Sequence, residues 1–231
     1  MRLSQATAAF LQNVEQQTPD DSRYNYSRSL DLLIASFNSK CRLNDITISR
    51  LRDFLAKCYI EQISAKGRIA EIPAPDEMLS SMKDFFFWVE PYSDGEVTRQ
   101  QLELIAELEH SLPRALEIFT ALSSDLAERG GAFGFPEFLT SFEEGGRSQY
   151  DIDTPGDVST REGYFRLIQI AGNEVEAEEL ITEERLWPVI FPEEVALLLE
   201  PDYIINLEVV RTSDGWRIAS CGFAYPPGTD I

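Results

Sequence analysis

Residues 203–225 read YIINLEVVRTSDGWRIASCGFAY, a pattern typical of two β-strands joined by a tight turn. Aromatic and β-branched side chains fill both flanks, residues 203–211 and 216–225, as strands require. Between the flanks, Asp214 and Gly215 form the dipeptide that most strongly indicates a hairpin. The end of the sequence is therefore predicted to form an antiparallel sheet.

Two earlier segments have the same strand composition, residues 163–170 (GYFRLIQI) and 187–191 (WPVIF), and a short helix is predicted at residues 192–199. Together they predict a small antiparallel β domain over residues 163–231, which we expect to be a partly closed barrel.

Before residue 145 the apolar residues recur at helical spacing instead. Pro75, Asp76 and Glu77 suit a first helical turn, and Thr98 with Gln101 forms a capping box. Helices are predicted before Thr18-Pro19, from Asp20, after Asp45, from Pro75, from Thr98, over 113–130 and at 136–142. The predicted class is thus α+β: a helical domain of five to seven helices (1–145), an acidic linker (146–162) and the β domain (163–231).

The chain is strongly acidic, with 40 Asp and Glu against 20 Lys and Arg among 231 residues and a formal net charge of −20. Such a field repels phosphate backbones and anionic lipid, so we expect no duplex DNA binding at physiological salt. The exception is residues 1–70, where Lys and Arg outnumber Asp and Glu.

The three cysteines, Cys41, Cys58 and Cys221, form no C-x-x-C pair and indicate a reducing compartment. The first residues lack the apolar run of a signal peptide, and no apolar stretch approaches the ~20 residues of a membrane span. The sequence predicts a cytoplasmic protein without membrane contact.

Residues 9–17 (AFLQNVEQQ), Tyr24 and Tyr26, residues 45–59 (DITISRLRDFLAKCY) and 78–90 (MLSSMKDFFFWVE) follow one another in a recognisable order. This order resembles the core-binding domain of tyrosine recombinases, over about residues 8–90. The resemblance implies a helical domain of SAM-like fold that clamps DNA. A nucleic-acid-binding face on the first helices would then include Arg42, Arg50, Arg52 and Lys57.

The catalytic residues of that family cannot be assembled from this sequence. Tyrosine recombinases need a His-x-x-Arg pair, whereas His110 is the one histidine and the next arginine, Arg114, is four residues on. A lone histidine also excludes zinc sites that need several. We interpret His110 as a surface or capping residue near a helix end.

Two acidic segments could suggest a metal or catalytic site. Residues 151–162 place acids at positions 1, 3, 7 and 12 of an EF-hand-like loop, but Pro155 occupies a ligand position and the flanking helices are missing. We therefore predict a solvated linker that binds no calcium tightly. The second segment, rich in glutamate over 174–184, is interpreted as a solvated face or an attraction for a basic partner. No catalytic, cofactor or metal site is predicted.

The run Phe85-Phe86-Phe87-Trp88 gives a helix with apolar side chains on both faces, because Phe87 points away from the stripe formed by its neighbours. Phe87 is therefore expected to pack on a second layer of this chain or on a partner. Phe87 and Trp88 are the candidate interaction surface.

By elimination, the sequence favours a non-enzymatic binding or adaptor protein without cofactor, whose partner is another protein or a second copy. One alternative is a nucleic-acid-binding protein that uses its first three helices. The other is an enzyme whose site is built from scattered carboxylates.

Overall fold

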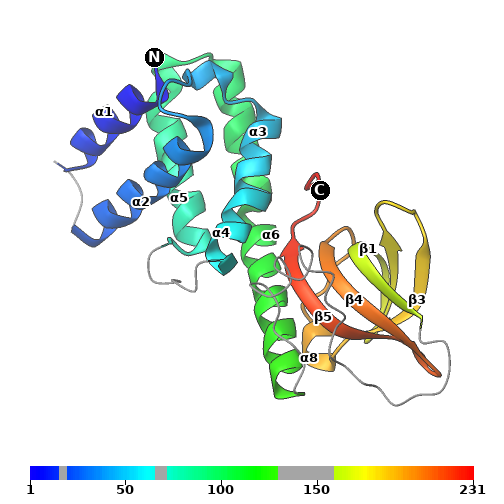
Figure 1. Ribbon diagram of the computed structural model, residues 1–231. Helices are drawn as coiled ribbons and strands as arrows, with labels where there is room; N and C mark the ends of the chain where they lie inside the picture. Colours follow the sequence, from blue (N-terminus) through cyan, green and yellow to red (C-terminus); the bar gives the residue numbers. More distant parts are fainter. Residues whose placement is uncertain (16–19, 66–71, 130–158) are drawn as a thin grey trace, which may run out of the picture. The chain divides into compact units, whose positions relative to one another are not determined.

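The computed structural model describes residues 1–15, 20–65, 72–129 and 159–231 (Figure 1). The chain divides into two compact units, Met1–Pro113 and Arg114–Thr229. Within the described ranges six α-helices precede five strands, which confirms the α+β class. The predicted helix at 136–142 and residues 146–158 of the predicted linker lie outside these ranges.

The helices and short helical turns of the first part follow the predicted order. They are α1 (Leu3–Glu15), α2 (Asp20–Phe37), η1 (Leu43–Asp45), α3 (Ile48–Asp53), the π-helical turn η2 (Phe54–Cys58), α4 (Tyr59–Ala65), α5 (Pro75–Val89), η4 (Glu90–Tyr92) and α6 (Gly95–Glu128).

Phe10 lies where α1, α2 and α5 meet, three helices that run side by side in Figure 1. Its ring is only 4 % exposed and makes edge-on contacts with Tyr26 at 5.5 Å, Phe85 at 5.6 Å and Trp88 at 5.8 Å between ring centroids. One phenylalanine therefore joins three helices of the first unit.

The helix α6 replaces two predicted helices, and the predicted break at Pro113 is wrong. Pro113 lies inside the helix, although an internal proline costs about 3 kcal/mol. The apolar stripe explains the continuity, because it recurs at helical spacing on both sides of the proline. Its buried members are Leu104, Ile105, Leu108, Leu112, Ala115, Ile118, Leu122 and Leu126.

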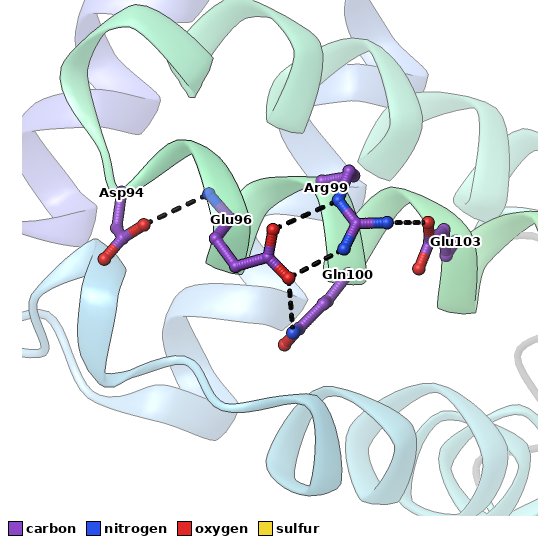
Figure 2. Close-up of polar contacts among 5 residues, drawn as sticks. All are labelled: Asp94, Glu96, Arg99, Gln100 and Glu103. Atoms are coloured by element: carbon purple, nitrogen blue, oxygen red, sulfur yellow. Dashed lines mark hydrogen bonds and ion pairs between the residues drawn. The ribbon is translucent and has the colours of Figure 1, made fainter.

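The start of α6 also differs from the prediction. The helix begins at Gly95, where Asp94 Oδ1 accepts a hydrogen bond from the backbone N–H of Glu96 at 3.1 Å (Figure 2). Thr98 and Gln101 are buried inside the helix, and Gln101 Nε2 donates to the backbone oxygen of Ile46 at 2.7 Å. The predicted capping box is therefore a tertiary contact instead.

Figure 2 shows Arg99 between two carboxylates on the same helix, Glu96 and Glu103. The hydrogen bond from Arg99, with a second from Gln100 at 3.0 Å, holds the pKa of Glu96 below its usual range. Because all these side chains are exposed, the pairs shape the surface of α6 more than they stabilise it.

The strands are β1 (Thr160–Ala171), β2 (Glu174–Glu179), β3 (Arg185–Ile190), β4 (Ile204–Thr212) and β5 (Gly215–Tyr225), with the short helix α8 (Glu193–Ala196) after β3. They close in a ring in the order β1-β2-β3-β5-β4, and β1 pairs with both β2 and β4. β1 begins before the predicted start of the β domain at Gly163.

One junction of the ring is parallel, which corrects the prediction of a purely antiparallel sheet. β3 and β5 run in the same direction and are paired only at Val189 with Trp216 and at Ile190 with Arg217. The other junctions are antiparallel. The ring is therefore a mixed sheet whose β3–β5 seam is short.

The acidic run at 174–184, predicted as a solvated face, contains a strand that the sequence analysis missed. Val175 and Ala177 alternate with glutamates and are buried, so β2 has one apolar face. The outward-facing glutamates pair with arginines: Arg185 is 3.3 Å from both Glu176 and Glu178.

The last residue of β2, Glu179, is a buried carboxylate that fixes the turn into β3. It is 7 % exposed and accepts hydrogen bonds from the backbone N–H groups of Thr182 at 2.6 Å and Ile181 at 3.2 Å. Gly163 on β1 makes room for it, because a Cβ there would lie 2.9 Å from Glu179 Oε1.

Glu179→Gln is expected to destabilise the protein by about 1–2 kcal/mol at pH 7, because charge-assisted hydrogen bonds to the turn are weakened. Burial by itself raises the pKa of Glu179, but the hydrogen bonds from Thr182 and Ile181 outweigh it and hold the pKa below 4.5. The stabilisation is therefore present above pH 4.5 and is lost as the pH falls through the lowered pKa. Urea titrations of both forms at several pH values measure this.

The matched control is Glu183→Gln, in the same turn, where the carboxylate is exposed. It should change the free energy of unfolding by no more than about 0.5 kcal/mol. A difference between wild type and Glu179→Gln that stays constant from pH 7 to pH 3 would contradict the assigned role.

Candidate functional site

Phe87 is exposed on α5, so of the two expected coverings, a second layer of this chain or a partner, the first is not found. Its side chain is 56 % exposed, whereas Phe85 and Phe86 are buried. Phe87 is exposed because it lies on the polar face of α5. One helical turn earlier, this face carries the charged residues Lys83 and Asp84. The helix therefore has one apolar face, and Phe87 interrupts the polar one.

Two more aromatic residues accompany Phe87 at the end of α5. Trp88 is half-buried and rests on Phe10, and its ring lies 5.4 Å from that of Tyr92 in η4. Tyr92 is itself 60 % exposed. We call Phe87, Trp88 and Tyr92 the α5 surface.

The charges next to the α5 surface are mainly negative. Asp84 and Glu90 are exposed, and the ammonium group of Lys83 lies 2.6 Å from a carboxylate oxygen of Glu109. Asp84 also accepts a hydrogen bond of 2.6 Å from the Tyr26 hydroxyl. Burial, together with this bond and the charge of Asp84, raises the pKa of Tyr26 to about 12, so Tyr26 remains a donor at neutral pH.

Two of the four basic side chains in the predicted nucleic-acid face, Arg52 and Arg50, make contacts within this chain. Arg52 forms two hydrogen bonds with Glu107, at 2.9 and 2.8 Å. Arg50 lies 4.9 Å above the ring of Phe37 and donates to the backbone oxygen of Asp45. Arg42 is exposed beside η1, and Lys57 is half-buried in η2.

The acidic partner of Arg52 weakens the nucleic-acid alternative. A bidentate pair between Arg52 and Glu107 leaves less positive charge for a phosphate backbone. A hollow of about 300 Å³ beside this pair is lined by glutamates as well, Glu103 and Glu107.

The remaining candidates from the sequence do not come together. His110 is exposed in the interior of α6 and not near a helix end, because the helix continues through Pro113. Cys58 and Cys221 are half-buried and not fully in the core. Burial raises the pKa of the Cys221 thiol to about 11, so it is protonated at neutral pH.

In the part of the chain that the structure describes, no three His, Cys, Asp or Glu side chains are placed to hold a metal ion. Of the EF-hand-like segment, residues 151–158 lie outside that part. Its last acid, Glu162, faces Glu208 across β1 and β4. Partial burial of its carboxyl group, with the charge of Glu208, raises the pKa of Glu162.

This carboxylate pair does not make an enzyme site by itself. Glu162 is exposed and Glu208 is half-buried, and neither lines the hollow beside Arg52 or the cavity between α6 and β5. Acid–base catalysis by carboxylates needs a concave, water-poor site around them. The enzyme alternative therefore gains no support here.

The second unit contains a cavity that no sequence motif predicts. A cavity of about 270 Å³ opens where β3 turns away from β5, under the last turns of α6. Its lining mixes apolar side chains with charges of both signs, among them Leu126, Ile218, Arg217 and Glu193. We call it the seam cavity.

Comparison with known proteins gives no match, whether to a family model, a curated protein or a solved structure. The resemblance of residues 8–90 to the core-binding domain of tyrosine recombinases therefore stays a prediction. Among the described helices, none is both long and apolar enough to cross a membrane.

Proposed function

We propose that the protein is a non-enzymatic binding protein that docks a protein partner on the α5 surface. The observation that carries the proposal is the exposure of Phe87 and Tyr92, which precede and follow the half-buried Trp88 in the sequence. Tyr and Trp residues supply a large share of binding energy in protein interfaces, where they fill pockets of the partner.

Trp88, the central residue of the α5 surface, packs on the core of the helical unit. This packing favours a docking site that is formed before a partner binds. Trp88 contacts Phe10, and Phe10 contacts α2 through Tyr26. A side chain held as Trp88 is loses little conformational entropy when a partner binds.

The negative charges around the α5 surface favour a partner whose contact surface has basic residues at its edge. Asp84 and Glu90 are exposed beside it, and Lys83, one helical turn before Phe87, is paired with Glu109. A second copy of this chain is disfavoured, because each copy carries a formal charge of −20 and the two would repel each other.

The test begins with a photo-crosslinking amino acid placed at Phe87 in the native host, which identifies the protein that docks there. With that partner purified, Phe87→Ala and Tyr92→Ala are each expected to weaken its affinity by about tenfold or more. Both variants should keep the wild-type free energy of unfolding to within about 0.5 kcal/mol, because both side chains are exposed.

The matched control is Tyr24→Ala on α2, which removes a tyrosine of similar exposure outside the α5 surface. Affinity that falls equally in the control and in Tyr92→Ala would contradict the assigned surface. A purified wild-type protein that sediments as a dimer, and as a monomer after Phe87→Ala, would replace the proposed partner by a second copy.

A further inference from the structure

The seam cavity exists because two parallel strands part. β3 and β5 are paired at Val189–Trp216 and Ile190–Arg217, after which the chain leaves the sheet through Phe191 toward α8. β5 continues to Tyr225 without β3 beside it. Ligand sites in proteins are concave and draw side chains from several elements, as this cavity does from α6, β5 and the residues that end β3.

Both walls of the cavity are fixed within the second unit. The α6 wall is held against β5 by the ring contact of Phe119 with Phe223 at 5.7 Å and by Ser123 Oγ, 3.8 Å from Cys221 Sγ. The end of β3 is fixed by the backbone N–H of Phe191, which donates to the backbone oxygen of Asn173 at 2.9 Å.

Apolar side chains from several elements form part of the cavity lining. Leu122 and Leu126 come from α6, Ile190 and Phe191 from the end of β3, and Ile218 from β5. At about 30 Å³ per water molecule, the volume of about 270 Å³ corresponds to about nine waters. Water beside these apolar side chains has few partners for hydrogen bonds, so a small apolar group that displaces it there gains free energy.

Four charged side chains line the cavity, two of each sign: Asp125, Arg129, Glu193 and Arg217. Asp125 and Arg129 neutralise each other in an ion pair of 2.8 Å. Arg217 has only a long contact of 3.7 Å with the exposed Asp214, which contributes little and is easily replaced. Glu193 forms no ion pair with a described residue.

We propose that the seam cavity binds a small zwitterion with an apolar body, such as an aliphatic α-amino acid. The guanidinium of Arg217 binds the carboxylate, and the carboxylate of Glu193 binds the ammonium group. The apolar body lies on Leu126, Ile190 and Ile218. A ligand with a negative charge alone would meet the repulsion of an acidic protein, whereas a zwitterion adds no net charge.

Isothermal calorimetry on the full chain with three probes of one shape tests both charges separately. Leucine carries both charges, leucinamide lacks the carboxylate, and 4-methylpentanoate lacks the ammonium group. We expect leucine to bind at least about tenfold more tightly than either analogue, since each analogue lacks one charge-assisted hydrogen bond.

The variants locate the site. Arg217→Gln and Glu193→Gln should each reduce leucine affinity by about tenfold, and Leu126→Trp should abolish binding by filling the cavity. The matched control is Arg166→Gln, which removes an exposed arginine of the same sheet that does not line the cavity, and it should leave the affinity unchanged.

Three results would overturn the proposal. They are no heat of binding with leucine at millimolar concentration, equal affinity for leucine and either analogue, and leucine affinity that survives Arg217→Gln. Circular dichroism of the variants confirms that each is folded, so that a lost signal reports the site.

Discussion

Replacing Phe10 with alanine is expected to destabilise the protein by about 3–5 kcal/mol. The ring is 4 % exposed and touches Tyr26, Phe85 and Trp88, so its loss leaves a cavity bounded by α1, α2 and α5. Three edge-on ring contacts disappear with it, each of which adds to the energy of burial. A urea titration followed by circular dichroism at 222 nm measures the change, because this unit is helical.

Phe87→Ala is the matched control, since it removes the same kind of side chain from α5, one of the three helices that meet at Phe10. Phe87 is exposed, so its replacement should change the free energy of unfolding by no more than about 0.5 kcal/mol. Equal losses in the two variants would mean that Phe10 is not the residue that joins the three helices.

The contrast between these two phenylalanines shows what the sequence could and could not predict. Helical spacing located α5 and its buried stripe correctly, because amphipathic periodicity is set by local geometry. The same spacing could not decide whether a second layer covers Phe87. Coverage depends on where other helices pack, and that is a property of the tertiary structure.

Two local signals were outweighed by packing. Pro113 normally ends a helix, but a buried apolar stripe continues on both sides of it. In β2, Val175 and Ala177 show the alternation of a strand, but the glutamates around them also fit a solvated acidic face. A search for alternate apolar positions inside the acidic run would have found the strand.

The seam cavity could not be predicted at all. Its charged residues Asp125, Glu193 and Arg217 are far apart in the sequence, and no spacing rule relates them. The parallel pairing of β3 with β5 also depends on how the ring closes, whereas the β4–β5 hairpin is encoded locally by Asp214 and Gly215.

Gly215 has a second role in that closure, and Gly215→Ala is expected to cost about 3–5 kcal/mol. Its φ angle is +139°, which side chains other than glycine rarely adopt, and a Cβ would lie 2.6 Å from the backbone oxygen of Pro188. Pro188 precedes the first residue of the β3–β5 seam, Val189. Backbone cannot move aside as the end of a flexible side chain can, so the added methyl group pushes β3 away from β5.

The control for this substitution is Gly172→Ala in the turn between β1 and β2. Gly172 also has a positive φ, +64°, but a Cβ there would meet nothing within 4 Å. It should therefore cost only the backbone strain, about 1–2 kcal/mol. Urea titrations of the two variants measure both losses of stability. The difference between them is the cost of the steric clash with Pro188, because the backbone strain is common to both.

Gly215→Ala should also affect the seam cavity, because Ile190 and Arg217 belong to both the seam and the cavity lining. A seam held by only two residue pairs has little pairing energy to resist the displacement of β3. The variant is therefore expected to lose leucine binding under conditions where it is still folded, whereas Gly172→Ala keeps it. Equal costs for the two glycines would show that β3 can shift freely, and the short parallel seam would then not be what fixes the cavity.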